Sequence, residues 1–174
     1  METSFSYPAT LTKKERYTQF TNDFRLYIDG ETEALALLAN TAAALREAFG
    51  FFWVGFYLVR DTEWLTLGPF QGSTACSRIK RGRGVCGTAW NDARTLVVPN
   101  VDEFPGHIAC SSLSRSEIVV PLVADGKVCG VLDIDSDQLN AFDETDREGL
   151  EGVVSVLMNA LSTASMPQLW PPQH

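Results

Sequence analysis

The chain has 174 residues, a formal net charge of −8 and a sequence pI near 4.7. Hydrophobic residues make up 45% and charged residues 21%, which is ordinary for a globular protein, and the length suits one domain. The acidic balance argues against a nucleic-acid partner, because the cationic run at 78–83 is too short to form a basic face.

The N-terminal residues lack the basic segment and apolar run of a signal peptide. The longest nearly apolar stretch, 49–59, is too short to cross a bilayer. We therefore expect a cytoplasmic protein that has no membrane contact. Thiols are kept reduced in that compartment, so the four cysteines need an explanation other than a structural disulfide. They are too far apart in sequence to match the short Cys-x-x-Cys pairs of zinc sites.

Two helices open the predicted fold. The first begins at a cap, either Thr10 or Thr12, and continues to Tyr27. The second covers 31–48, is rich in alanine and leucine, and stops before Gly50. Strands at 52–59 and 64–70 follow, and the polar turn between them predicts a hairpin.

Residues 71–92 are glycine-rich and polar, and an irregular segment of that length is uncommon unless it is functional. The remaining predicted elements are a strand at 95–99, an irregular stretch at 100–115, a hairpin of strands 117–124 and 128–135, and a final helix from 143 to about 162. The order predicts an α+β fold, with an antiparallel sheet, the N- and C-terminal helices on one face, and both long loops forming a pocket over the other. The domain is expected to cover 1–163, and 164–174 to be a flexible tail.

The strands place chemically distinctive residues on the loop face. Trp53 and Tyr57 share that face, with Gly55 between them, and a strand glycine often marks a close approach to the backbone. This pair is either a surface patch covered by a loop or an aromatic wall around a small ligand. In the last strand the acids alternate with core residues, so that Asp133, Asp135 and Asp137 face the loops. Such a row is usually a solvated face, but a ligand ammonium group would relieve its repulsion.

The register of the second hairpin decides whether Glu117 joins these acids. A two-residue turn at 125–126 would pair Glu117 with Ile134 and place it on the opposite face. A three-residue loop with Gly126 left-handed instead pairs Glu117 with Asp133 and keeps the apolar residues together. Hydrophobic burial favours the second register, and we adopt it.

Several motifs resemble the GAF fold and, within it, the free methionine-(R)-sulfoxide reductases. The resemblance covers about 13–163 and rests on "WVGFY" at 53–57, "GPFQG" at 68–72, "GRGVCGTAW" at 82–90, "VPNV" at 98–101, "HIACSSLSRSEIVVPL" at 107–122 and "GVLDIDS" at 130–136. Pieces such as "GVLDIDS" recur in many GAF domains, whereas the three cysteines in these settings are strong evidence for the resemblance to the reductases.

The resemblance implies a role for each candidate residue. Cys110 would be the nucleophile, Cys76 would resolve its sulfenic acid, and Cys86 would be a further redox partner. The implied substrate site consists of the acids Glu117, Asp133 and Asp135 and the aromatic residues Trp53 and Tyr57. Cys129 matches no family motif, and we expect it to be a buried core thiol.

These residue types suit sulfoxide reduction. A thiolate attacks the sulfoxide sulfur and becomes a sulfenic acid. A carboxylic acid with a raised pKa protonates the sulfoxide oxygen, and Glu117 is the candidate for this acid. A second thiol then captures the sulfenic acid. An external dithiol, expected to be thioredoxin, then reduces the disulfide, and no metal or organic cofactor is required. The acids would bind the ammonium group of free methionine sulfoxide, and a homodimer is expected from the resemblance. The alternative function is a GAF sensor that binds a small molecule without turnover, although a sensor needs no reactive cysteines.

Overall fold

The computed structural model describes residues 4–106 and 112–165. The helices are α1 (Lys13–Tyr27), α2 (Ala34–Phe49), α3 (Gly84–Asp92) and α4 (Glu144–Leu161), and a short 3₁₀ helix, η1, covers Val101–Glu103. The strands are β1 (Trp53–Val59), β2 (Trp64–Gln71), β3 (Arg78–Lys80), β4 (Leu96–Val98), β5 (Ser116–Ala124) and β6 (Lys127–Ser136).

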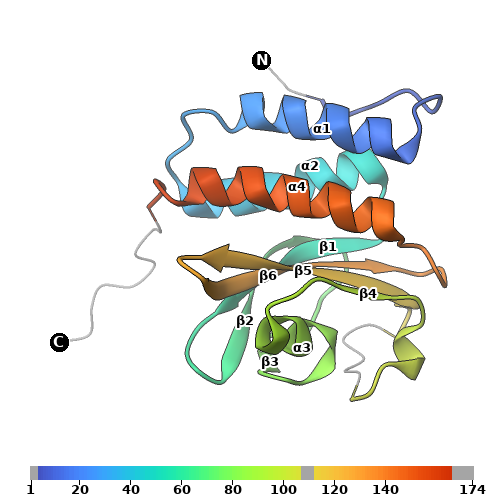
Figure 1. Ribbon diagram of the computed structural model, residues 1–174, viewed down its shortest axis with the longest axis vertical. Helices are drawn as coiled ribbons and strands as arrows, with labels where there is room; N and C mark the ends of the chain where they lie inside the picture. The colour runs from blue at the N-terminus through green and yellow to red at the C-terminus, as the bar shows by residue number, and fades with distance from the viewer. Residues whose placement is uncertain (1–3, 107–111, 166–174) are drawn as a thin grey trace.

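A single antiparallel sheet divides the described part of the molecule into two layers. Its six strands follow the order β3-β2-β1-β6-β5-β4. Helices α2 and α4 cover one face, with α1 packed on their outer side, and α3 with the connecting segments covers the other face (Figure 1). The predicted α+β class and the placement of the N- and C-terminal helices on one face are therefore confirmed.

Local capping explains where the long helices begin and end. Thr12 caps α1 through a reciprocal capping box with Glu15, which decides between the two predicted caps. Asp143 caps α4 in the same way with Asp146. Gly50 follows α2 in a left-handed conformation, with φ of 69°, as expected for a helix stop.

The described hydrophobic side chains form two clusters, one on each face of the sheet. The first lies beneath the helices and takes Val54 and Phe56 from β1 and Leu132 and Ile134 from β6. The second lies beneath α3 and contains Trp53, Tyr57 and Cys86 among others. The alternation of strand residues therefore places the aromatic and acidic residues opposite the helical layer, as predicted.

The prediction that 71–92 is irregular was wrong in part. The segment contains β3, which extends the sheet, and α3, which packs across β5 and β6. The buried residues of α3 include Val85, Cys86, Ala89 and Trp90, whose spacing is that of a helical face. Burial of this face, rather than helix propensity, explains why a glycine-rich stretch becomes a helix.

The hairpin register also differs from the prediction. The turn is the two-residue one, with Asp125 and Gly126 both at positive φ (49° and 73°), and Ala124 pairs with Lys127. The pairing then shifts between Val123 and Leu122, because Cys129 is an additional residue in β6. This β-bulge pairs Glu117 with Asp135, not with Asp133, and returns Glu117 to the face of the acids.

The bulge also corrects the prediction for Cys129. Its side chain is exposed rather than buried in the core, and its thiol donates a hydrogen bond to the carbonyl oxygen of Leu122 at 3.4 Å. A bulged residue has no partner across the ladder, so its side chain need not follow the alternation of the strand.

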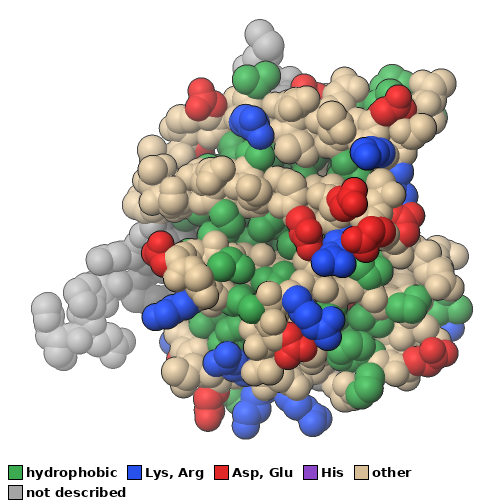
Figure 2. Space-filling model, in the orientation of Figure 1, with side chains coloured by type: hydrophobic (Ala, Val, Ile, Leu, Met, Phe, Trp, Pro, Cys, Tyr) green, Lys and Arg blue, Asp and Glu red, His purple; other side chains and the backbone are tan. Residues whose placement is uncertain are grey.

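The surface around α3 and β3 carries the basic run found in the sequence. Its exposed members are Arg78, Lys80, Arg81 and Arg83. Several basic side chains gather at this end of the molecule on the face shown in Figure 2, with acidic ones among them.

Among the helices that the structure describes, none has the length and apolarity needed to cross a membrane.

Candidate active site

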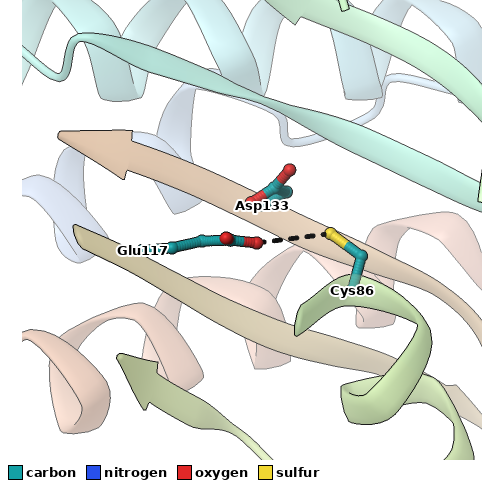
Figure 3. A group of neighbouring side chains, drawn as sticks. All are labelled: Cys86, Glu117 and Asp133. Carbon is teal, nitrogen blue, oxygen red and sulfur yellow. Dashed lines mark hydrogen bonds between the residues drawn. The ribbon is translucent and has the colours of Figure 1, made fainter. Parts of the chain in front are cut away.

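Three polar side chains from three elements meet beneath α3. Glu117 extends from β5, Asp133 from β6 and Cys86 from the first turn of α3 (Figure 3). Only 6% of each acid and 2% of Cys86 is exposed. The thiol donates a hydrogen bond to Oε1 of Glu117, with 3.8 Å between Sγ and the oxygen. We call Glu117, Asp133 and Asp135 the acid cluster.

Sheet register explains why these acids are neighbours. Asp135 pairs with Glu117 on one side and with Trp53 on the other, so the three residues lie in line across β5, β6 and β1. Asp133 lies two residues along β6 and therefore on the same face. Asp137, which was predicted to continue this row, lies beyond the end of β6 and is exposed.

Burial dominates the electrostatics of the acid cluster. It raises the pKa of Glu117 and of Asp133 well above the usual value, and the negative charge of Asp135 raises both further. Burial raises the pKa of Asp135 to about 6, and a hydrogen bond from Ser114 opposes that shift. Within the described residues, Oδ1 of Asp133 is buried without a hydrogen-bond partner. Burial therefore favours the protonated forms of Glu117 and Asp133, while Asp135, whose pKa is about 6, is the first of the three to ionise as the pH rises.

The variant Asp135→Asn should be more stable than the wild-type protein at neutral pH. The pKa of this carboxyl is about 6 in the folded protein against an ordinary 3.8. As the pH rises, the carboxyl of Asp135 therefore loses its proton at a lower pH in the unfolded chain than in the folded protein. The protonated carboxyl stabilises the fold fully below about pH 4, and this stabilisation is lost as the pH rises to about 6. We expect a gain of roughly 1–3 kcal/mol in the free energy of unfolding near neutral pH and little near pH 4. Urea unfolding at the two pH values measures it, and an equal gain at both would contradict a raised pKa for the partly buried Asp135.

Trp53 and Tyr57 form an aromatic wall beside the acid cluster and also hold a neighbouring segment in place. Trp53 stacks on Phe70 with ring centroids 5.3 Å apart, and its Nε1 donates to the carbonyl oxygen of Ser73 at 2.9 Å. The hydroxyl of Tyr57 donates to the carbonyl oxygen of Cys76 at 2.9 Å. The segment that carries Cys76 thus covers the aromatic wall. Phe70 also belongs to this wall, and the sequence analysis missed it although it lies in the "GPFQG" motif.

Gly55 provides the space that Trp53 and Phe70 occupy. A Cβ added at Gly55 would lie 2.3 Å from Cβ of Phe70 and 2.7 Å from Cη2 of Trp53. We therefore expect Gly55→Ala to destabilise the protein by about 1–3 kcal/mol through overpacking and to perturb the fluorescence of Trp53.

The matched control is Gly152→Ala on α4, where nothing lies within 4 Å of the added Cβ. This substitution should be neutral or stabilising by up to about 1 kcal/mol, because alanine is the better helix former. Denaturant unfolding of both variants provides the comparison, and a Gly55→Ala variant as stable as wild type would show that the two rings are not fixed by this contact.

The structure describes three of the four cysteines. Cys76 is disulfide-bonded, whereas Cys86 and Cys129 carry free thiols. Cys110, the predicted nucleophile, lies outside the described residues. The structure therefore brings Cys86, Glu117, Asp133, Asp135, Trp53 and Tyr57 to one face, with the backbone of Cys76 against Tyr57.

Within 4–106 and 112–165, the side chains Cys86, Glu117 and Asp133 are the group that could hold a metal ion. Each offers one ligand atom, and these atoms lie within 4.8 Å of one another. Cysteine spacing gave no sign of this group, because two of its members are acids on other elements. A thiol with two carboxyls can share a proton, accept hydrogen bonds from an ammonium group or coordinate a divalent cation.

Comparison with known proteins identifies the family of this chain. The GAF domain family matches residues 33–161. The chain is 47% identical over 154 residues to the free methionine-R-sulfoxide reductase of Escherichia coli (strain K12), covering 88% of this chain and 93% of that protein. It is 55% identical over 147 residues to GAF domain-containing protein A of Dictyostelium discoideum, covering 84% and 93%.

The solved structure of free methionine-R-sulfoxide reductase from Neisseria meningitidis in complex with its substrate superposes with a TM-score of 0.87. The two chains are 51% identical, and the match covers 91% of this chain and 96% of the other. With the fold, the acid cluster and the extent of these matches taken together, this chain belongs to the GAF domain family and, within it, to the free methionine-R-sulfoxide reductases.

Proposed function

We propose that this protein reduces free methionine-(R)-sulfoxide to methionine. The observation that carries the proposal is the acid cluster, in which Oδ1 of Asp133 is buried without a partner beside the aromatic wall. A buried acceptor of this kind favours a cationic donor, and the ammonium group of a free amino acid provides one. The names of the Escherichia coli and Neisseria meningitidis relatives support the same substrate.

The chemistry divides between thiol and acid. The thiolate of Cys110 attacks the sulfoxide sulfur, and the oxygen takes up one proton. The oxygen then passes to Sγ of Cys110 as the bond between the two sulfurs breaks, so that methionine leaves and Cys110 becomes a sulfenic acid. Glu117 is the proposed proton donor, because its burial favours the protonated form. Asp133 and Asp135 bind the substrate ammonium, and the aromatic wall contacts the apolar part of the substrate.

Recycling requires a second thiol and an external reductant. Cys76 attacks the sulfenic acid, water leaves, and the resulting disulfide is reduced by a dithiol protein of the thioredoxin type. The proximity of Cys76 to the aromatic wall supports this assignment, since the carbonyl oxygen of Cys76 accepts a hydrogen bond from Tyr57.

A stereoisomer-resolved assay tests the proposal. The reduced protein is incubated with the free R and S sulfoxides of methionine and with a peptide that contains methionine sulfoxide, each with a dithiol. We expect turnover of the free R isomer alone, because an internal methionine of the peptide has no ammonium group for the buried acids to bind. Binding of the R isomer without methionine release would instead indicate a sensor.

A further inference from the structure

Cys86 is a free, buried thiol in the first turn of α3. It is the third residue of α3, and its Sγ donates to Oε1 of Glu117. On the basis of the proposed function above, we propose that Cys86 is a positioning residue: it stays protonated, orients the Glu117 carboxyl by this hydrogen bond, and takes no part in disulfide exchange.

The backbone around Cys86 fixes the thiol in this place. The amide of Gly82 donates to the carbonyl oxygen of Gly87 at 2.9 Å, and the amide of Arg83 donates to that of Lys80 at 3.0 Å. A Cβ at Gly87 would lie only 2.3 Å from the carbonyl oxygen of Lys80, so the first turn of α3 is held tightly against β3. A disulfide requires two sulfurs about 2.05 Å apart. Cys86 could form one only if its partner cysteine entered the buried acid cluster or if α3 moved away from β3.

The environment of Cys86 also opposes a role as an attacking thiol. Exchange requires a thiolate, and burial raises the pKa of Cys86 well above its usual value. The negative charges of Asp133 and Glu117 raise that pKa further. A thiol that keeps its proton in a row of acids is instead a hydrogen-bond donor to one of them.

Donation from the thiol affects the proton affinity of Glu117. Burial and the charges of Asp133 and Asp135 raise the pKa of Glu117, while the hydrogen bond from Cys86 lowers it by stabilising the ionised form. Cys86 therefore limits the upward shift, and it holds Oε1 in one orientation. Loss of the donor should make Glu117 harder to deprotonate, so that a reaction which needs its proton persists to higher pH.

Two substitutions at one position separate this role from a redox role. Cys86→Ala removes the donor, whereas Cys86→Ser keeps one. We expect the alkaline limb of the pH profile of kcat to move upward by about half a pH unit to one unit in Cys86→Ala. In Cys86→Ser the limb should lie closer to that of wild type. Both variants should release about one methionine per subunit in a single turnover and form the same disulfide as wild type.

A disulfide map of the wild-type protein completes the test without any substitution. The protein is oxidised with the sulfoxide or, separately, with hydrogen peroxide, then alkylated in denaturant and digested. Cys86 should carry the alkyl label under both conditions. A dominant disulfide that contains Cys86, or pH profiles of both variants identical to wild type, would overturn the inference. Peroxide oxidises the cysteines without sulfoxide turnover, so the map reports on Cys86 even if the wild-type protein does not reduce methionine sulfoxide. That failure would overturn the proposed function but not the inference about Cys86.

Discussion

Cys110→Ser should abolish multiple turnover of free methionine-(R)-sulfoxide while leaving the protein folded. A serine hydroxyl remains protonated at neutral pH and is a poor nucleophile toward sulfur, so the step that forms the sulfenic acid is lost. We expect a fall in kcat of about a thousandfold or more, as is typical for removal of a nucleophile. Methionine release with a thioredoxin-type reductant is the measurement, and circular dichroism and urea unfolding monitor the fold.

The chain provides a matched control for this substitution. Cys129 has a free, exposed thiol on the β5–β6 hairpin, outside the acid cluster, so Cys129→Ser should turn over like wild type. Near-normal multiple turnover by Cys110→Ser would move the nucleophile to another cysteine, and Cys86 would then be the first to test.

Asp133→Asn should weaken the binding of the substrate by about ten- to a hundredfold in kcat/KM, mainly through a higher KM. The amide oxygen still accepts a hydrogen bond from an ammonium group but carries no negative charge, so the ionic part of the interaction is lost, and hydrogen bonds to charged groups contribute roughly 1.5–3 kcal/mol. Steady-state kinetics on the free R isomer measure this loss. Unchanged kinetics would show that the acid cluster is only the polar side of a strand.

Glu117→Gln is the informative comparison, since Glu117 belongs to the same acid cluster but is proposed to move a proton. Its effect should fall on kcat, with KM much less affected, and the pH profile should lose one limb. A rise in KM without a fall in kcat would assign Glu117 to ammonium binding and leave the proton donor to another acid of the cluster.

Much of the architecture could be predicted because local signals and burial agree. Thr12 and Gly50 mark helix ends by their own backbone chemistry, and the alternation of Leu132 and Ile134 with the acids identifies both faces of β6. The grouping of Trp53 with the acids on one face follows from the same periodicity.

The remaining features depend on tertiary contacts. Glycines in 82–87 suggest a loop, and α3 forms because its apolar side packs on the sheet, a contact that no local pattern contains. The hydrogen bond between Cys86 and Glu117 joins residues 31 positions apart in sequence and depends on where α3 crosses β5. The position of the bulge at Cys129 was likewise not visible, since a hairpin turn alone does not show where an additional residue is accommodated.

Because of the additional residue Cys129, the number of residues in the β5–β6 hairpin determines which side chains face each layer. Glu117 faces the acids only because Cys129 offsets the ladder by one position between the turn and the rest of β6. A deletion at this exposed position would shift the pairing by one, and every strand residue beyond it would face the other layer. Carboxyl groups would then face the apolar side of the long helices, and Leu132 and Ile134 would face the place of the acids. The hairpin end has the surface exposure of a site that tolerates insertions and deletions, yet its residue count is constrained as tightly as that of the core.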